Sequence, residues 1–436
     1  MKIVIAPDSF KNCMIAREAA EAIRAGFARV LPDADYDLIP MADGGEGTVQ
    51  SLVDATGGEL RYADVLDPLG RPTRAAYGLL GKSGGDAETI DAGTADTDVA
   101  DNTDGMDAAD VSDDRTGIGD DCDVYDDGNV DAAATRTAVI EMAAASGIQF
   151  VDDATKNPLV TTTYGTGQLI RDALDAGARR IILGVGGSAT NDGGAGMAEA
   201  LGARLLDVHG QPIPRGGGAL DRLASIDVTG LDLRLAATDI IIASDVTNPL
   251  TGPTGASAVF GPQKGATPDM VARLDANLAH YARIIAAQLG RDIVHTPGAG
   301  AAGGLGAGLL AFTNATMRSG VDIVAHTVRL AERAADADWC ITGEGGIDRQ
   351  TQYGKTPVGV AQAARRGNPR IRVVALAGRV DYGEDGRALD PLHELGIDAV
   401  FGITPAAMPL ARALAAGPAN LANTAENVAR LIALRP

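Results

Sequence analysis

Acidic residues stand in five short turns of this chain, flanked by Gly, Asn or Ser and not placed on charged helix faces. The turns lie at residues 8–11, 43–47, 191–193, 244–249 and 343–348. Four of the five follow directly on a predicted β-strand, and in open α/β sheets ligands collect beyond the carboxyl ends of the strands. Any single acid of this kind can simply close an Asx-turn or cap a helix. The placement shared by all five predicts a ligand site.

The strongest local pattern is a strand followed by consecutive glycines and hydroxyls. Residues 184–196 read Gly-Val-Gly-Gly-Ser-Ala-Thr-Asn-Asp-Gly-Gly-Ala-Gly. Glycines let the backbone approach an anion, and free N–H groups with the helix dipole favour negative charge there. The pattern predicts a phosphate or carboxylate cradle, with a merely tight turn as the alternative. A second cluster at residues 298–306 either wraps phosphates or forms a small-residue helix packed closely on another element.

The same glycines allow an NAD-linked oxidoreductase as an alternative. Gly184-x-Gly186-x-x-Ala189 precedes Asp207 by about twenty residues, the spacing of a dinucleotide-binding fingerprint. Asp207 also fits a hairpin whose turn lies at His209 and Gly210. Such an enzyme would bind NADH and ignore ATP.

Lysines complete the equipment for phosphoryl transfer. This reaction needs glycine loops around phosphates, carboxylates for Mg²⁺, a lysine on the transferred group, and an acid that orients or deprotonates the attacking hydroxyl. Lys11, Lys264 and Lys355 each stand in a turn, and they are three of only six lysines in the chain. A Walker-type NTPase is excluded, because Arg349 occupies the position that requires its first glycine.

The charge of the chain is concentrated in one segment. Residues 84–134 carry −16 of the formal net charge of −21, and they include few large apolar side chains. We therefore predict a disordered or loosely ordered insertion there. A calcium loop at residues 123–134 is a weaker alternative, since Tyr125 and Ala134 occupy ligand positions. The remaining sequence shows no basic patch, so no nucleic-acid partner is expected.

The sequence predicts a cytoplasmic protein. Cys13, Cys122 and Cys340 show neither paired nor metal-ligand spacing, which indicates a reducing compartment. The apolar run at residues 2–6 is too short for a signal peptide. The uncharged stretch at residues 296–317 is mostly Gly and Ala, too weakly apolar to cross a membrane. We expect no membrane partner, and the oligomeric state is not predicted.

Short β-branched runs alternate with helical periods along the chain, which is the pattern of βα units in a parallel sheet. Strands are predicted at residues 2–6, 178–184, 240–244, 339–342, 372–376 and 399–403. Helices are predicted at residues 16–30, 48–55, 167–176, 268–288, 357–364 and 424–434. A length of 436 residues suggests two domains.

Eight motifs follow one another in a recognisable order. They are Ala-Pro-Asp-Ser-Phe-Lys at 6–11, Ala-Asp-Gly-Gly-Glu-Gly-Thr at 42–48, Val-Ile-Glu-Met-Ala-Ala-Ala-Ser-Gly at 139–147, Gly-Gly-Ser-Ala-Thr-Asn-Asp-Gly-Gly at 186–194, Ser-Asp-Val-Thr-Asn-Pro-Leu at 244–250, Gly-Pro-Gln-Lys-Gly-Ala at 261–266, Gly-Ala-Gly-Ala-Ala-Gly-Gly at 298–304 and Gly-Glu-Gly at 343–345. Their order and spacing resemble the type I glycerate kinase family from Met1 to about Ile432.

This resemblance implies transfer of the ATP γ-phosphoryl group to D-glycerate with Mg²⁺, giving 2-phosphoglycerate in preference to 3-phosphoglycerate. It also implies an α/β fold of two α/β domains. A Rossmann-like domain formed by both chain ends, residues 1–67 and 290–436, is interrupted by a second α/β domain at residues 68–289, which carries the acidic insertion. The site is expected in the cleft between the two domains.

Chemistry and resemblance together assign candidate roles. Asp192 is the first choice and Asp245 the second for orienting or deprotonating the glycerate hydroxyl, and Lys11 is the third catalytic candidate. Candidates for phosphate and ATP binding are Gly186, Gly187, Ser188, Lys355, Gly300 and Gly303. Candidates for substrate binding are Asp8, Ser9, Asn191, Asn248 and Lys264. Candidates for Mg²⁺, directly or through water, are Asp43, Glu46, Glu344 and Asp348.

Two departures from the family pattern stand out. Gly346 occupies a position where the family usually has Arg, a role that Arg349 could take instead. The acidic insertion interrupts a region where the family runs from a strand at residues 75–80 almost directly into residues 138–142. We expect deletion of residues 84–134 to leave kinase activity largely intact. A metabolite-binding or calcium-binding module that worked through this segment would lose binding instead.

Overall fold

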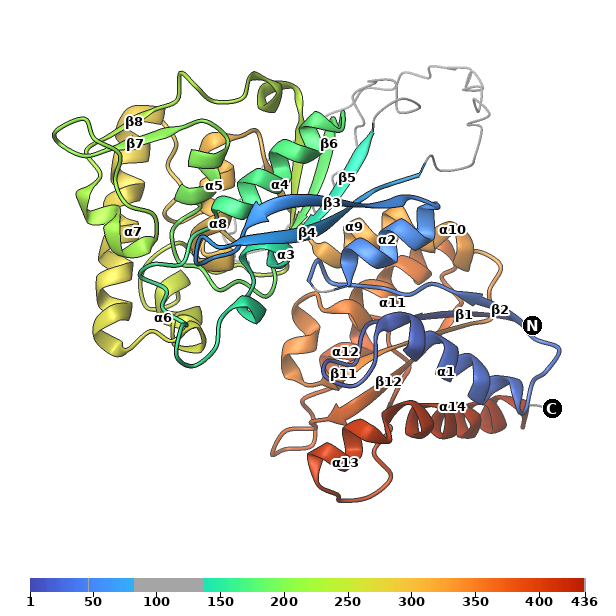
Figure 1. Ribbon diagram of the computed structural model, residues 1–436. Helices are drawn as coiled ribbons and strands as arrows, with labels where there is room; N and C mark the ends of the chain where they lie inside the picture. The colour runs from blue at the N-terminus through green and yellow to red at the C-terminus, as the bar shows by residue number, and fades with distance from the viewer. Residues whose placement is uncertain (46, 82–135, 435–436) are drawn as a thin grey trace, which may run out of the picture. The chain divides into compact units, whose positions relative to one another are not determined.

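The structure, a computed structural model, describes residues 1–45, 47–81 and 136–434 (Figure 1). Glu46, the predicted insertion at residues 84–134 and the calcium-loop alternative within it lie outside the described residues. The described strands form one five-stranded, one six-stranded and one two-stranded sheet. Helices flank the two larger sheets, so the predicted α/β class is confirmed.

The five-stranded sheet combines strands from both ends of the chain. Its order is β13-β12-β11-β1-β2, and all of its neighbouring strands pair in parallel. The strands are β1 (Lys2–Pro7), β2 (Asp35–Leu38), β11 (Trp339–Ile347), β12 (Arg372–Val380) and β13 (Ala399–Gly402). Parallel strands of this kind are buried on both faces, which explains their nearly continuous apolar sequence.

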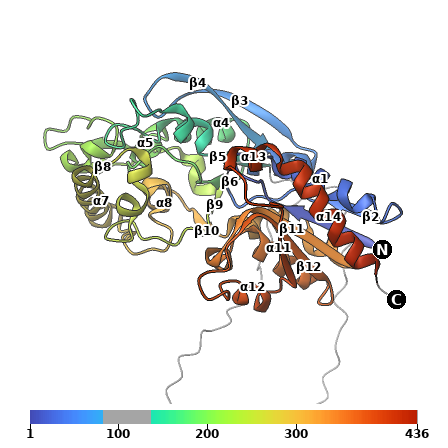
Figure 2. The same ribbon diagram turned by 90° about the horizontal axis from the view of Figure 1, so that it is seen from below.

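Alternate residues of β1 pack on opposite faces of this sheet, as the two-residue period of a strand requires. Ile3 and Ile5 join the core formed with α1 (Ala16–Ala28) and α14 (Gly417–Ala433), two helices that lie side by side in Figures 1 and 2. Val4 and Ala6 join the core formed with α9 (Gly320–Thr327) and α11 (Thr356–Gly367), beside which α10 (Leu330–Ala334) packs. The helices therefore hold the sheet from both sides.

The six-stranded sheet is mixed and has the order β10-β9-β6-β5-β4-β3. β5, β6, β9 and β10 pair in parallel, whereas β3 and β4 form an antiparallel pair beside them. The strands are β3 (Glu59–Leu66), β4 (Pro72–Leu79), β5 (Thr137–Glu141), β6 (Arg180–Gly184), β9 (Asp239–Ala243) and β10 (Thr316–Arg318). α4 (Tyr164–Asp175) packs in the core on one face, and α2 (Thr48–Thr56) packs in the core on the other.

The remaining elements surround the second sheet and close the chain. α3 (Ala143–Ser146) follows β5, α5 (Ala195–Ala200) follows β6, and the small sheet consists of β7 (Arg204–Leu206) and β8 (Ser225–Asp227). The other helices are α6 (Ala256–Phe260), α7 (Pro268–Leu289), α8 (Ala301–Phe312), α12 (Asp390–Glu394) and α13 (Leu410–Ala415), and the 3₁₀ helices are η1 (Ile148–Phe150), η2 (Gly217–Arg222), η3 (Leu233–Ala237), η4 (Pro262–Lys264) and η5 (Arg349–Tyr353).

The ends of α7 show how local sequence sets the helix bounds. Thr267 caps the first turn, because its hydroxyl accepts a hydrogen bond from the Met270 N–H, and Pro268 occupies the first helical position. Gly290 ends the helix in a left-handed conformation with φ 67°. Between these signals, Leu278, Tyr281 and Ile285 face one core.

All six predicted strands are confirmed, as β1, β6, β9, β11, β12 and β13, and the six predicted helices are confirmed as α1, α2, α4, α7, α11 and α14. The last of these begins at Gly417, earlier than the predicted residue 424, because Pro418 is tolerated in the first turn. The six-stranded sheet includes residues on both sides of the predicted 68–289 range, since β3 starts at Glu59 and β10 ends at Arg318. The domain boundaries stay a prediction.

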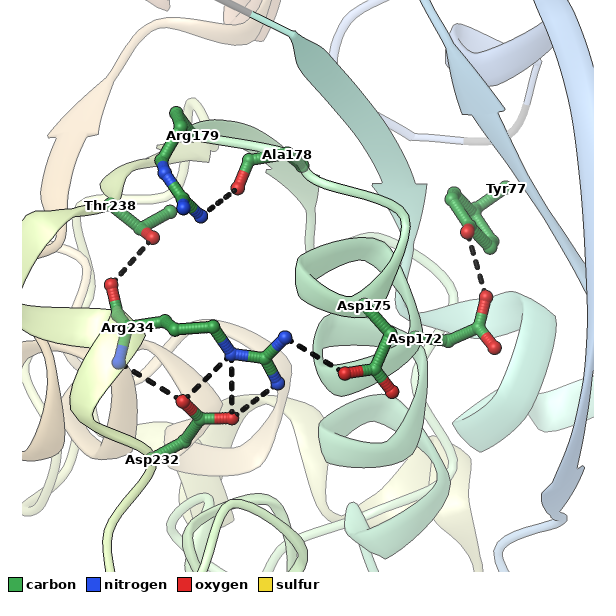
Figure 3. A network of polar contacts seen from close by, with 8 residues as sticks. All are labelled: Tyr77, Asp172, Asp175, Ala178, Arg179, Asp232, Arg234 and Thr238. Atoms are coloured by element: carbon green, nitrogen blue, oxygen red, sulfur yellow. Dashed lines mark hydrogen bonds and ion pairs between the residues drawn. The ribbon is translucent and has the colours of Figure 1, made fainter.

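A polar network joins elements at the amino ends of β6 and β9 (Figure 3). Arg234, in η3, forms ion pairs of 2.6 Å with Asp232 and 2.8 Å with Asp175 at the end of α4. Tyr77 of β4 donates a 2.7 Å hydrogen bond to Asp172 of the same helix. This network lies at the sheet edge opposite the carboxyl ends of these strands, so its role is structural. Among the helices described here, none is long and apolar enough to span a membrane.

Candidate active site

Asp8 follows β1 at the carboxyl edge of the five-stranded sheet and is almost fully buried, with 8% of its surface exposed. Its two oxygens accept hydrogen bonds of 2.6 Å from the Thr356 hydroxyl and the Ser9 N–H. Burial, reinforced by the negative charge of Asp43, raises the pKa of Asp8 to about 6. A carboxyl group of this kind changes its charge close to neutral pH.

Glu344 lies within β11, the neighbour of β1. Burial raises its pKa to about 7, and the charges of Asp8 and Asp43 act in the same direction. Lys355 opposes this shift, and the Thr351 hydroxyl donates a 3.3 Å hydrogen bond to Glu344 Oε1. Two acids from adjacent parallel strands thus share one electronegative region.

The turn that carries Asp43 lies against the ends of β6 and β9. A Cβ atom on Gly44 would stand 2.8 Å from the Ala243 carbonyl oxygen, and one on Gly184 would stand 2.2 Å from the Gly44 carbonyl oxygen. Gly44 has φ 85°. Only glycine fits here, because the backbones meet directly and the conformation is left-handed.

Asp245 follows β9 and faces the start of α9. Its Oδ1 accepts a 3.1 Å hydrogen bond from the Gly320 N–H. Burial raises the pKa of Asp245 to about 6; a bond from Ser319 opposes this shift, and the charge of Asp43 adds to it. Asp43 is therefore the common neighbour of three perturbed acids.

We call Asp8, Asp43, Asp245 and Glu344 the carboxylate cluster. Oxygen ligands of this type suit Mg²⁺, which usually takes one or two carboxylates together with substrate phosphates. Mutual repulsion among the acids shows that the region favours a cation. Among the residues that the structure describes, no group of three or more His, Cys, Asp or Glu is arranged to hold a metal ion by itself. Asp348 was also predicted as an Mg²⁺ ligand. It caps η5 by accepting a hydrogen bond from the Gln350 N–H.

Two of the predicted lysines accompany this cluster. Lys11 is exposed, and its charge opposes the pKa shift of Asp8. Lys355 occupies the N-cap position of α11, and its Nζ lies 3.6 Å from Asp348 Oδ1. Positive side chains and a helix N-terminus are the features that bind phosphate oxygens.

The predicted cradle lies near the same region. Gly186 and Gly187 are exposed and Ser188 is half-buried, and a Cβ atom on Gly186 would stand 3.0 Å from the Gly45 Cα. A backbone hydrogen bond holds the turn in place, because the Gly187 carbonyl accepts a 2.8 Å bond from the Ile148 N–H. Its exposed surface is backbone that can approach an anion.

The structure does not bring Asn191, Asp192 or Lys264 to this surface. Asn191 and Asp192 have no exposed surface, and Lys264 has 1%. Asp192 accepts hydrogen bonds from Thr162, Thr163, Gly194 and Gly196. In this conformation Asp192, the first choice for the catalytic acid, is a buried hydrogen-bond acceptor.

Gly300 and Gly303 are also closely packed. A Cβ atom on Gly303 would stand 2.0 Å from the Thr190 carbonyl oxygen, and one on Gly300 would stand 2.3 Å from that of Pro249. This packing matches the small-residue alternative for residues 298–306 better than a phosphate loop. Asn248, partly exposed, donates a 2.8 Å bond to the Thr254 carbonyl.

Asp207, the candidate ribose ligand of the oxidoreductase alternative, is committed to a turn. Its Oδ1 accepts bonds from the N–H groups of His209 and Gln211, and these bonds lower its pKa. The hairpin interpretation accounts for it without a dinucleotide.

Thr356 and Ser319, which bond Asp8 and Asp245 of the cluster, were not predicted from the sequence. The Thr-Pro pair at Thr356, a helix-start signal directly after Lys355, could have indicated the first. Ser319 caps α9 through the Asp322 N–H, so its Ser-x-x-Asp pattern could have indicated the second. Gly346 has open space where a Cβ would stand, so a longer side chain fits at that position.

Fold and site together define an α/β protein with acids, lysines and a glycine turn at the carboxyl ends of parallel strands. The family model described as "Glycerate kinase family" matches residues 3–102 and 123–433. The gap between the two matched ranges, residues 103–122, falls inside the predicted acidic insertion. The family model thus also matches residues 84–102 and 123–134, so the departure from the family is shorter than predicted.

Relatives match along the whole chain. A glycerate kinase of Bacillus subtilis (strain 168) is 49% identical over 434 residues, which cover 100% of this chain and 98% of the relative. A glycerate 2-kinase of Escherichia coli (strain K12) is 43% identical, again with 100% and 98% covered. A crystal structure assigned to glycerate kinase 2 of Salmonella typhimurium LT2 superposes with a TM-score of 0.76 at 46% identity, covering 99% of this chain and 98% of that one. The chain belongs to the glycerate kinase family, and it is an enzyme of the kinase class.

Proposed function

We propose that this protein transfers the γ-phosphoryl group of ATP to a hydroxyl of D-glycerate and releases 2-phosphoglycerate. The observation that carries the proposal is the carboxylate cluster, in which Asp8, Asp245 and Glu344 all have raised pKa values and share Asp43 as a neighbour. Two lysines and an exposed glycine turn accompany it. Relatives named glycerate kinase support the acceptor, and the Escherichia coli name supports the 2-position.

In this proposal Asp245 takes the first place as general base, ahead of Asp192. A base works best with a pKa near the working pH, and that of Asp245 is raised to about 6 by burial. Asp192 is fully buried and bonded on both oxygens. The glycerate hydroxyl oxygen attacks the γ-phosphorus, its proton passes to the base, and the bond between the γ-phosphorus and the ADP oxygen breaks.

Lys11, Lys355 and residues 186–188 bind the phosphates in this proposal. Ser9, which follows Asp8, and Asn248, three residues after Asp245, are both partly exposed and position glycerate in this proposal. Asp43 and Glu344 would hold Mg²⁺, which would neutralise phosphate charge. We also propose a cytoplasmic location for the enzyme.

The test is incubation of the purified protein with Mg-ATP and D-glycerate, followed by ³¹P NMR of the product. The signal of 2-phosphoglycerate is expected, and that of 3-phosphoglycerate would correct the position only. Asp245→Asn should lower kcat by about 10²-fold or more, as loss of a general base does. Asp207→Asn, in a surface turn, is the matched control and should keep wild-type turnover. If folded wild-type protein forms no ATP-dependent product, the proposal is overturned.

A further inference from the structure

Behind the exposed glycine turn lies a set of completely enclosed polar side chains. We call Thr190, Asn191, Asp192, Lys264 and Tyr281 the interior polar cluster. Lys264 has 1% of its surface exposed, and the other four have none. Burying an ammonium group costs several kcal/mol unless interactions compensate for it. Interactions within the cluster must therefore offset the cost of burying the Lys264 ammonium group.

Lys264 makes one hydrogen bond with a clear structural consequence. Its Nζ donates to the Thr190 carbonyl oxygen at 2.7 Å, from η4 to a loop 74 residues away in sequence. Burial lowers the pKa of Lys264 to about 7, while the charge of Asp192 favours the ammonium form. The lysine is thus a donor to the backbone of the loop and the electrostatic partner of the acid within it.

Asp192 fastens the same loop to two helix starts. Its Oδ2 accepts from the Thr163 N–H at 2.8 Å, directly before α4, and from the Gly196 N–H at 3.3 Å, in the first turn of α5. Its Oδ1 accepts from the Gly194 N–H at 3.2 Å. Lys264 and Asp192 together fix residues 190–194 from both sides.

Besides the bonds of Asp192, the loop's side chains make one further hydrogen bond among the described residues, from Asn191 Nδ2 to the Ser257 hydroxyl at 2.9 Å. Thr190 Oγ1, Asn191 Oδ1 and the Tyr281 hydroxyl are buried without a hydrogen-bond partner among the described residues. Most buried polar groups in proteins are paired, and an unpaired one costs about 1–3 kcal/mol. With two of its polar atoms unsatisfied, the loop depends on its remaining bonds, which are those of Lys264, Asp192 and Asn191 and the 3.0 Å bond from the Gly193 N–H to the Gly303 carbonyl.

The exposed turn at residues 186–188 is continuous with this loop. Its flanking bonds, from the Ile148 N–H to the Gly187 carbonyl and from the Ala189 N–H to the Ser146 carbonyl, are backbone bonds of 2.8 and 3.0 Å. Gly186 has no side chain with which to hold its position. A shift at Thr190 therefore moves the turn, because only Ala189 separates Ser188 from Thr190.

We propose that Lys264 is a positioning residue, which holds the Thr190 backbone and thereby sets the phosphate-binding turn at residues 186–188. The proposal rests on the proposed function, which assigns that turn to ATP. It gives Lys264 a role without contact to either substrate. The enclosed position of the ammonium group supports this over the substrate-binding role expected from the sequence.

The experiment compares ATP affinity and turnover in Lys264→Met, Lys264→Gln and wild type. Met removes both the charge and the donor, whereas Gln keeps an N–H donor without the charge, on a side chain one bond shorter than that of Lys. ATP affinity is measured by calorimetry with a non-hydrolysable ATP analogue and Mg²⁺, and KM for D-glycerate is measured separately. Displacement by about 1 Å can cost up to about 10²-fold. We expect at least tenfold weaker analogue binding in Lys264→Met, partial recovery in Lys264→Gln and an unchanged KM for glycerate.

Two control variants separate positioning from other roles. Lys156→Met removes a lysine that forms a surface ion pair with Asp153, and should change nothing. Tyr281→Phe removes an unpaired hydroxyl and should leave both substrates at wild-type values. A raised KM for glycerate in Lys264→Met or Tyr281→Phe would overturn the proposal in favour of direct acceptor binding.

Remaining outcomes also decide the question. Unchanged analogue binding in both Lys264 variants would overturn the proposal while leaving the proposed function intact. Loss of the far-UV circular dichroism of both variants would overturn it as well, because Lys264 would then serve stability. Wild-type protein that binds no ATP analogue would overturn the proposed function, and the inference that rests on it, before any variant is compared.

Discussion

Replacement of Asp8 by Asn should make the protein more stable near neutral pH and should remove a pH dependence of stability. In the folded chain the pKa of Asp8 is raised from 3.8 to about 6, chiefly by burial. A carboxyl with a raised pKa contributes its stability below the unfolded pKa and loses it as the pH rises through the folded pKa. The relevant window therefore runs from about pH 4 to above pH 6.

The magnitude follows from the shift. A difference of about two pKa units corresponds to roughly 3 kcal/mol at high pH, since one unit is worth about 1.4 kcal/mol. Between about pH 4 and pH 7.5 the part that develops is roughly 2 kcal/mol. Asn keeps one oxygen acceptor for either Ser9 or Thr356, so loss of the other bond costs about 1 kcal/mol at all pH values.

The assay is urea unfolding of wild type and Asp8→Asn at several pH values across this window. The variant should gain stability relative to wild type as the pH rises, by roughly 2 kcal/mol in total. Asp227→Asn is a control of opposite sign, because hydrogen bonds from Thr229 lower the pKa of Asp227. The stability that Asp227→Asn loses relative to wild type should become smaller as the pH falls. A stability difference for Asp8→Asn that stays constant between pH 4 and pH 7.5 would refute the reasoning.

Three further perturbations test other parts of the structure. Gly303→Ala should destabilise the protein by more than about 3 kcal/mol, because its Cβ would stand 2.0 Å from the Thr190 carbonyl oxygen at φ 69°, whereas Gly210→Ala, at φ 73° in open space, should cost about 1 kcal/mol in the same chemical denaturation. Asp43→Asn should lower the pKa of the other cluster acids; NMR titrations without a downward shift would contradict this. Arg234→Met should lower Tm by no more than a few degrees, since ion pairs that remain partly open to solvent contribute about 1 kcal/mol each, and a large loss of kcat would contradict its structural role.

Local sequence was sufficient for much of the fold. The six predicted strands are short apolar runs whose period and flanking glycines distinguish them from helices. The edge strands were harder, because β3 reads Glu-Leu-Arg-Tyr-Ala-Asp-Val-Leu, with most of its residues exposed. Such a strand is fixed by pairing with β4 along its whole length, a long contact that no local pattern records.

The candidate site was predicted in part. The acids of the carboxylate cluster were recognised by their place after strands, and the exposed turn at residues 186–188 by its glycines. The sequence could not distinguish the exposed end of that motif from its buried end. Residues 186–188 and 190–192 belong to one continuous glycine-rich segment, yet tertiary packing exposes the first part and encloses Asp192 with Lys264.

By itself the sequence determined the α/β class, the order of the main elements, the family to which the chain belongs, and the turns in which acids and glycines stand. These are properties of local period and motif, which chain neighbours specify. Only the tertiary structure decided which of these turns meet. The sheet order places Asp8 beside Glu344, and close glycine contacts hold the turn of Asp43 near enough for its charge to act on both Asp8 and Asp245. Their raised pKa values arise from burial and mutual repulsion, which depend on distances through space.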